Sequence, residues 1–559
     1  METQDPLPAQ LPMVKLTFVS LILAAGAIFA YARLLPDDRI TLALARLFRQ
    51  FSRHRTLACL VPAILVLIVR AALLPVWPIP RPAIYDEFSY LLQADTFAHR
   101  RLTNPPHPLW QFFESIYILQ QPTYASKYPP GQALVMAAGQ RLFGDPWYGV
   151  WLSCGVLAAM LCWALQGWLP PPWALLGTLI ATNLCMFSYW MNSYWGGAVA
   201  GIGGALVTGS WPRIVRARRT GNAWFFGAGA AILLLTRPFE GFLLVAPASL
   251  ALWINVKRVR IWLPIVAVGA AGLGWQAFYD YRVTGHPLRM PYQEYFAQYE
   301  SVPPLNILPV QPRKEFRHFD LEFLDSGWTR DMNARARSWQ LPLIRAADFE
   351  RTARMMFGHP LWLVILVAFA PVWFRSRRIR LPLILACVMA GGAMFELIYY
   401  VHYAAPIMAV LLILLLQSLR VFRAWSARYL AVGKQGGTFA VLALLCSFAG
   451  PAAVVEVSHI YRHTTPDQIR PRNARKGTIE KDLLRNHPGR HVIFVRYTGV
   501  QKPHEEWIYN PSNIAGAPVI WAQDMGSENE RLMAYYRGRM FWIFEPDIDP
   551  VRLHPFTPA

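Results

Sequence analysis

The sequence is poor in cysteine, and no cysteine lies where an outer disulfide framework would need one. All six cysteines fall within apolar stretches, and no C-x-x-C pair suggests a metal or redox motif. A Gly-rich nucleotide loop is missing as well. Gly197, Gly201, Ala205 and Gly209 recur every four residues inside an apolar run, without the G-x-G-x-x-G spacing or a preceding strand. Such a repeat instead favours close packing of helices in lipid.

Acidic residues are scarce, at 33 Asp and Glu against 54 Lys and Arg. With 55% hydrophobic residues and 22 tryptophans in 559 residues, the composition is not that of an ordinary soluble protein. The net charge of +21 does not require a nucleic-acid partner. Basic loops beside anionic lipid account for much of it, so we expect a lipid bilayer and no nucleic acid among the partners.

Apolar runs long enough to cross a membrane recur along the chain. About twelve are candidates, because roughly 17–25 apolar residues span a bilayer. The first run follows Glu2 and Asp5 rather than a basic segment, so we expect a retained helix and not a cleaved signal peptide. The expected fold class is an all-α polytopic membrane protein. The candidate spans are 14–32, 57–76, 147–168, 173–190, 193–211, 222–236, 239–255, 261–278, 357–374, 381–399, 404–420 and 437–456.

Lysine and arginine are concentrated in the loops on one side of these spans. Cytoplasmic loops carry the excess of basic residues. The short loops on the other side contain a single basic residue, Arg237. We therefore expect both termini on the outer side of the membrane. The loops assigned to the cytoplasm hold 20 Lys and Arg in total and are 33–56, 169–172, 212–221, 256–260, 375–380 and 421–436.

Most of the polar sequence falls on the outer face. We divide the chain into an N-terminal helix with a basic loop (1–56), a transmembrane domain (57–456) and a small C-terminal α/β domain (457–559). The transmembrane domain carries outer loops at 77–131 and 279–356. This distribution suggests that the protein works at its outer surface. In the C-terminal domain we predict strands at 491–497, 517–521 and 541–544, and a helix at 529–537.

The outer loops also contain short helical patterns. Apolar spacing predicts an amphipathic helix over Tyr85–His99, with Asp86, Tyr90 and Gln93 on its polar side, and another over Asp331–Met356. The apolar segment Gln132–Phe143 is too short to span and predicts an interfacial helix.

Asp86 and Glu87 stand side by side just beyond the end of an apolar run, in IYDEFSYLLQ. Ionisable residues held at a membrane boundary are candidates for function. The alternative is that the pair only caps a surface helix.

Other charged residues border the outer ends of the apolar runs. Arginine or lysine can hold a phosphate, and a carboxylate can deprotonate a hydroxyl as a general base. A polar cavity at the outer leaflet therefore suits a phosphate carried on a lipid. For Arg70 and Arg282, snorkelling of the charge to the interface is the main alternative. The charged and polar candidates are Arg70, Lys127, Arg237, Glu240, Asp280, Arg282, Glu396, Tyr399, Tyr400 and His402.

Three segments resemble the GT-C superfamily of membrane glycosyltransferases. They are IYDEFSYLLQA (84–94), SKYPPGQALVMAAGQRLFGDPW (126–147) and YYVHYAAP (399–406). The nearest branch contains bacterial proteins similar to protein O-mannosyltransferases and to the lipid A aminoarabinose transferase. The resemblance covers about residues 57–420 and implies an inner-membrane protein, so that the outer side, on which the charge distribution places both termini, would be the periplasm.

The resemblance also implies roles for individual residues. Asp86 would be the catalytic base and Glu87 a positioning residue, Lys127 would contact the lipid phosphate, and His402 and Tyr403 would line the donor site. From their positions we add three residues: Arg237 at the phosphate, and Tyr90 and Glu396 in the cavity.

These observations predict an inverting glycosyltransferase. It would move a hexosyl or pentosyl group from a polyprenyl-phosphate donor to a hydroxyl on a glycan, lipid or protein. A transporter or flippase for a lipid-linked saccharide is the alternative, and a structural membrane protein a third. No cofactor is assigned. A divalent metal is left open, because family members differ in metal dependence and the acids are few: Asp86, Glu87, Asp95 and Glu114.

Overall fold

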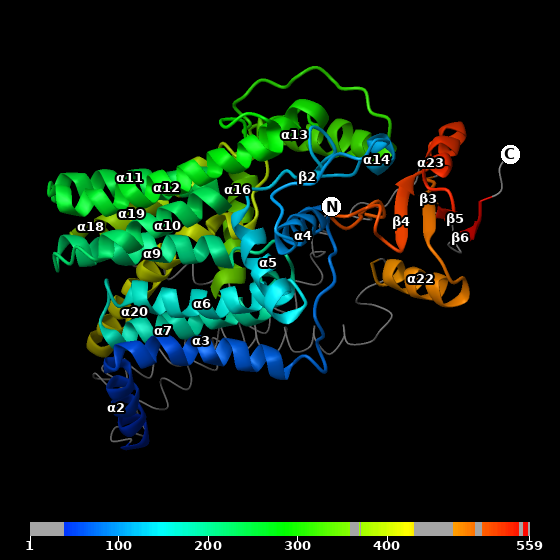
Figure 1. Cartoon of the computed structure of the whole chain (residues 1–559). Helices are drawn as coiled ribbons and strands as arrows, with labels where there is room; N and C mark the ends of the chain where they lie inside the picture. Colours follow the sequence, from blue (N-terminus) through cyan, green and yellow to red (C-terminus); the bar gives the residue numbers. More distant parts are fainter. Residues whose placement is uncertain are drawn as a thin grey trace.

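A computed structural model describes residues 39–357, 368, 370–429, 473–497, 506–546 and 552–556. Helices form an elongated bundle, and a small sheet lies beyond one end of it (Figure 1). The predicted spans 14–32 and 437–456, and most of 357–374, lie outside the described residues.

The bundle contains helices of membrane-spanning length. Five described helices are long and apolar enough to cross a membrane, and three shorter apolar helices accompany them. The protein is therefore a multi-pass helical membrane protein, whereas the count of about twelve spans stays a prediction. The five are α3 (Arg55–Ala72), α6 (Trp147–Leu165), α11 (Pro238–Asn255), α12 (Val259–Thr284) and the run Val401–Tyr429, which joins η3 (Val401–Ile407) to α20 (Met408–Tyr429). The remaining bundle helices are α2 (Arg39–Arg53), α7 (Pro171–Phe187), α8 (Tyr189–Asn192), α9 (Ala198–Val215), α10 (Asn222–Thr236), α18 (Ala370–Arg375) and α19 (Arg380–Ala393).

The core of the bundle is built around α20. Its residues from Met408 to Leu416 are buried except Leu411, whereas α3 exposes Leu57, Ile64 and Ile68 along its length. An apolar helix that is buried on all sides is central, and one that exposes leucine and isoleucine in a membrane protein faces lipid.

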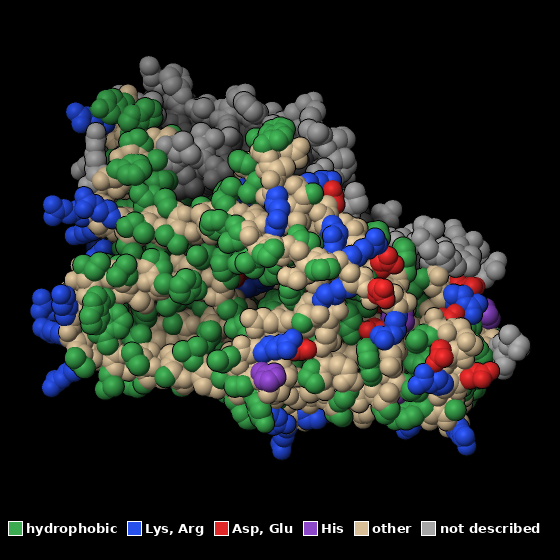
Figure 2. Space-filling model, turned by 90° about the horizontal axis from the view of Figure 1, so that it is seen from above, with side chains coloured by type: hydrophobic (Ala, Val, Ile, Leu, Met, Phe, Trp, Pro, Cys, Tyr) green, Lys and Arg blue, Asp and Glu red, His purple; other side chains and the backbone are tan. Residues whose placement is uncertain are grey.

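The ends of the bundle differ in charge. Lys and Arg lie at one end without acidic neighbours, hydrophobic side chains cover the middle, and both signs of charge occur over the other end (Figure 2). This arrangement agrees with the predicted orientation, in which the purely basic end faces the cytoplasm. The end with both signs of charge is called the outer end below.

Most elements at the outer end agree with the predicted helices. The pattern over 85–99 forms α4 (Tyr85–Ala98), and the interfacial segment forms α5 (Gly131–Phe143). The single helix predicted over 331–356 is wrong, because the chain turns at 337–340 between two helices. The other outer elements are η1 (Trp110–Phe113), β1 (Ile118–Leu119), β2 (Ala125–Ser126), α13 (Pro291–Tyr299), α14 (Phe319–Glu322), η2 (Phe323–Thr329), α15 (Arg330–Ala336) and α16 (Leu341–Phe357).

The C-terminal segment contains a four-stranded sheet in the order β4-β3-β5-β6. Strand β3 pairs in parallel with β4 and β5, and β6 runs antiparallel to β5. Three of these strands were predicted, and β6 and α22 were not. That this segment is an independent domain stays a prediction. Its elements are α22 (Asn473–Asn486), β3 (His491–Val495), β4 (Val519–Gln523), η4 (Gly526–Glu528), α23 (Asn529–Tyr535), β5 (Met540–Glu545) and β6 (Arg552–Pro555).

One face of this C-terminal sheet packs on the first outer loop. Val492 and Phe494 share a core with Phe112 and with Leu92 of α4. Their neighbours in the strand, Ile493 among them, point to the opposite face and pack against α22. The C-terminal sheet thus forms part of the support of α4.

Candidate active site

Helix α4 begins where Glu87 caps its own first turn. One carboxylate oxygen accepts hydrogen bonds from the backbone N–H groups of Ala83 at 2.6 Å and Ile84 at 3.3 Å. The other oxygen accepts the N–H of Tyr194 at 2.8 Å, in the loop before α9. The capping alternative therefore applies to Glu87, which orients the helix. Burial raises the pKa of Glu87 to about 7, although these N–H groups oppose the shift.

Arg70 fixes the chain that leads into α4. Its guanidinium donates to the side-chain oxygen of Asn192 at 2.8 Å and to the backbone carbonyls of Trp77 at 2.8 Å and Pro78 at 3.2 Å. It also lies over the ring of Trp147 at 5.0 Å. Snorkelling is therefore wrong for Arg70, whose side chain is fully buried.

Asp86 points away from these capping contacts and is partly exposed. The hydroxyl of Tyr128 donates to its Oδ1 at 2.5 Å, and the ring of Tyr128 stacks on Tyr90 with centroids 4.4 Å apart. Burial raises the pKa of Asp86, while Tyr128, Lys127 and Arg237 act in the opposite direction. Burial also raises the pKa of Tyr128, so its hydroxyl stays protonated at neutral pH and donates.

Lys127 lies in a cage of tyrosine rings. Its Nζ is 3.6 Å from the ring centroid of Tyr117 and 4.8 Å from that of Tyr295. The rings of Tyr128 and Tyr292 lie further out, each at 5.7 Å. Cation–π contact of this kind stabilises an ammonium group where water is scarce. The cage thus retains a positive charge close to Asp86.

Arg237 stands between α10 and α11, immediately before Pro238 at the first position of α11. It forms an ion pair with Glu240 at 3.6 Å and lies over the ring of Tyr403 at 4.4 Å. Its charge reaches Asp86, whose pKa it lowers. The structure therefore brings both predicted cations, Lys127 and Arg237, into electrostatic range of the predicted base.

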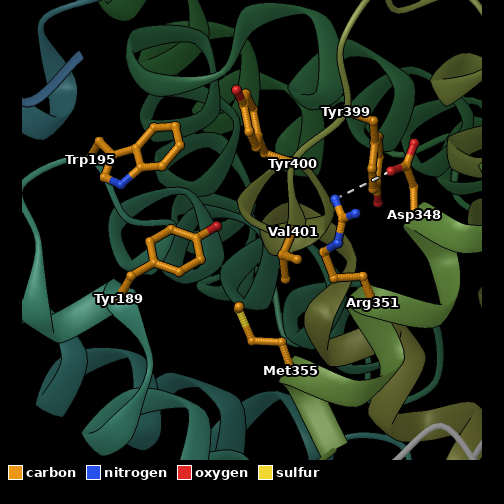
Figure 3. Close-up of a pocket in the computed structure, with 8 residues that line it drawn as sticks. All are labelled: Tyr189, Trp195, Asp348, Arg351, Met355, Tyr399, Tyr400 and Val401. Carbon is orange, nitrogen blue, oxygen red and sulfur yellow. Dashed lines mark ion pairs between the residues drawn. The ribbon is translucent and has the colours of Figure 1, made fainter. Parts of the chain in front are cut away.

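Tyr403, whose ring lies under Arg237, and its neighbour His402 are found beside a small cavity. The Nδ1 atom of His402 is 2.7 Å from the hydroxyl of Tyr189, and its ring is 4.7 Å from that of Trp195. The cavity has a volume of about 30 Å³ and is lined by aromatic rings together with the Asp348–Arg351 ion pair (Figure 3).

Glu396 is buried near the same group of charges. One of its carboxylate oxygens has no hydrogen-bond partner among the described residues. The charges of Glu240, Arg237 and Arg345 act on Glu396. Among the described residues, no hydrogen bond or ion pair joins Glu396 to Asp86, and its place in the cavity stays a prediction.

The remaining acids considered for a metal have other partners. Asp95 accepts the N–H of Ser512 at 2.9 Å, and Glu114 lies 3.3 Å from His318 and 3.4 Å from Arg317. Within the described ranges, no group of three or more His, Cys, Asp or Glu residues could hold a metal ion.

The sequence interpretation missed most of the tyrosine cage. Tyr292 and Tyr295 stand three residues apart on α13, and Tyr299 follows four residues later. This is the spacing of one helix face. Their meeting with Lys127 depends on α13 packing beside the β1–β2 hairpin, a tertiary contact without a local signal.

In comparison with known proteins, the chain is similar to solved structures of two proteins. ArnT from Cupriavidus metallidurans, in the apo state and bound to undecaprenyl phosphate, has a TM-score of 0.49 at 14% identity, over 86% of this chain and 92% of that chain. The Archaeoglobus fulgidus oligosaccharyltransferase in its apo form has a TM-score of 0.45 at 12% identity, over 86% of this chain and 69% of that chain.

No family model and no curated protein matches the chain. Both TM-scores are below 0.5, so any chemistry assigned to the site has to rest on this chain's own residues.

Proposed function

We propose that this protein is an inverting glycosyltransferase that moves a sugar from a polyprenyl-phosphate donor to an acceptor hydroxyl at the outer face of the membrane. One observation carries the proposal. Asp86 is a partly exposed carboxylate, oriented by Tyr128 and within electrostatic range of Lys127 and Arg237. A base beside two cations, at the end of membrane-length helices, suits a substrate with a lipid tail and a phosphate head.

In the proposed reaction, Asp86 accepts the proton of the acceptor hydroxyl. The hydroxyl oxygen attacks the anomeric carbon from the side opposite the phosphate, and the bond between that carbon and the phosphate oxygen breaks. Lys127 and Arg237 stabilise the negative charge that the phosphate gains. Glu87 does not react, since its oxygens accept backbone N–H groups that fix the start of α4.

The other predicted residues would act around this centre. Tyr90 holds the ring of Tyr128 through their stack. Tyr403 supports the guanidinium of Arg237, and His402 lies against Tyr403 with ring centroids 4.9 Å apart. Glu396, near Glu240, would lie at the edge of the site that takes the donor and the acceptor.

The distribution of charge favours a transferase over a transporter. A transporter needs access from both leaflets and places its binding site near the middle of the bilayer. In the described chain, the charged groups of the proposed site lie where helices end, at the α10–α11 junction and on α4. Together with the basic opposite end of the bundle, this supports a bacterial inner-membrane protein with a periplasmic site and periplasmic termini.

Transfer of radiolabelled sugar tests the proposal. Membranes containing the wild type should move label from polyprenyl-phosphate sugars to an acceptor. Asp86→Asn should lower the rate about 10²–10⁴-fold, the usual contribution of a general base. Asp331→Asn, which changes an exposed aspartate on α15, is the matched control. Equal rates in Asp86→Asn and wild type would remove Asp86 from the mechanism.

A further inference from the structure

Lys127 already forms an ion pair with a carboxylate of its own chain. Its Nζ lies 2.8 Å from Oε1 of Glu300, the residue that follows α13. The side chain of Lys127 is 8% exposed and that of Glu300 is 21% exposed. Because tyrosine rings surround the ammonium group elsewhere, Glu300 stands at its more open side.

A phosphate that binds Lys127 must therefore compete with Glu300. A polyprenyl-phosphate sugar is a phosphodiester with one negative charge, whereas the polyprenyl phosphate left after transfer is a monoester whose second ionisation lies near neutral pH. The cations at the site attract this product more strongly than the donor. Without a counteracting charge, the product would remain bound after each turnover.

We propose that Glu300 is a displaceable counterion that expels the lipid phosphate product. This inference rests on the proposed function. The carboxylate moves aside when the donor phosphate binds, repels the product more strongly than the donor because the product carries more charge, and then pairs with Lys127 again. Glu300 acts through Lys127 and the phosphate, and it takes no part in bond formation.

The backbone beside Glu300 is held in place, so the side chain is the part of this residue that can move. The next residue is fixed, because the backbone N–H and the hydroxyl of Ser301 each donate to the carboxylate of Asp325 at 2.6 Å. A second cation is available to the displaced carboxylate. Lys314 binds the backbone carbonyls of Phe296 and Ala297 in the last turn of α13, and it attracts Glu300 electrostatically.

Direct binding of polyprenyl phosphate to the purified full-length protein tests this. Glu300→Gln removes the competing charge, so the dissociation constant should fall about three- to tenfold, the effect of losing one partly exposed ion pair. In turnover, KM and kcat should both fall, because release of the product becomes slower. Glu322→Gln removes an exposed carboxylate that pairs with Arg313 outside the site, and should change none of these three values.

Two further variants separate the outcomes. Lys127→Met should weaken binding of polyprenyl phosphate, and unchanged binding would overturn the proposed phosphate site itself. If Lys127→Met weakens binding but Glu300→Gln binds no more tightly than the wild type, only the counterion role of Glu300 is overturned. Glu300→Asp keeps the charge and should retain a wild-type dissociation constant within about twofold, which separates charge from shape.

Discussion

The hydroxyl of Tyr128 donates a hydrogen bond to Oδ1 of Asp86 over 2.5 Å, from the residue next to Lys127. A hydrogen bond to the ionised carboxylate favours the charged form and lowers its pKa. The bond also fixes the direction of Oδ1, so the second oxygen is the one left for the acceptor hydroxyl. Tyr128 therefore sets both the basicity and the orientation of the proposed base.

Tyr128→Phe removes this bond and keeps the ring that stacks on Tyr90. We expect the pKa of Asp86 to rise, since burial then acts with less opposition. A base works in its ionised form, so the acidic limb of the pH profile of kcat/KM should move to higher pH. Tyr124→Phe is the control, because the hydroxyl of Tyr124 donates to the carbonyl of Asn510 instead. An acidic limb that stays in place in Tyr128→Phe would contradict this assignment.

Substitutions of the two adjacent acids should differ in their effect on the thermal stability of the protein. Asp86→Asn should leave the melting temperature nearly unchanged, because Asp86 accepts a single side-chain hydrogen bond. Glu87→Gln places an amide N–H₂ group against backbone N–H donors on one side, and should cost about 1–3 kcal/mol of stability. Differential scanning fluorimetry of both variants in the same detergent makes the comparison. Equal melting temperatures would show that Glu87 does not cap α4.

Close packing of α9 gives a third prediction. A Cβ atom added at Gly204 would lie 1.9 Å from the backbone oxygen of Pro406, so α9 and η3 would have to separate. Gly204→Ala should therefore destabilise the bundle by about 1–3 kcal/mol. Gly269→Ala on α12 meets no atom within 4 Å and serves as the control. Equal melting temperatures for Gly204→Ala and Gly269→Ala would contradict the close packing of α9 on η3.

The sequence was sufficient to predict the elements whose pattern is local. The span 222–236 matches α10 residue for residue, and 239–255 differs from α11 by one residue. The acidic pair was also located correctly at the start of a helix. In each case the signal is an uninterrupted apolar run or a helical period within one segment.

The parts that depend on tertiary contact could not be predicted in the same way. Nothing near Lys127 in the sequence indicates Glu300, which is 173 residues away and pairs with it only because α13 packs on the first outer loop. The different hydrogen bonds of Asp86 and Glu87 likewise depend on Tyr128 and Tyr194, which lie in other segments of the chain. Sequence patterns supplied the charges, and the fold decided how they pair.

The last prediction concerns the C-terminal sheet. Glu506 is buried against it, with one oxygen accepting the N–H of Ile508 at 2.7 Å and the other without a hydrogen-bond partner among the described residues. Burial, and then the charge of Asp320, raises the pKa of Glu506 from 4.5 to about 8. Between these values the folded protein binds more protons than the unfolded chain, so stability falls as pH rises from about 4.5 to about 8.

Glu506→Gln should abolish this part of the pH dependence, because the amide resembles the neutral acid. Melting temperatures measured from pH 5 to pH 9 should therefore diverge, with the variant gaining on the order of 1–3 kcal/mol over the wild type at the alkaline end. Glu528→Gln, at an exposed pair with Arg531, is the control and should follow the wild type. Parallel curves for Glu506→Gln and wild type would contradict the role of Glu506. Since Ser512 of the same segment donates to Asp95 on α4, loosening of the sheet at high pH should also lower transfer activity in the wild type before it does so in the variant.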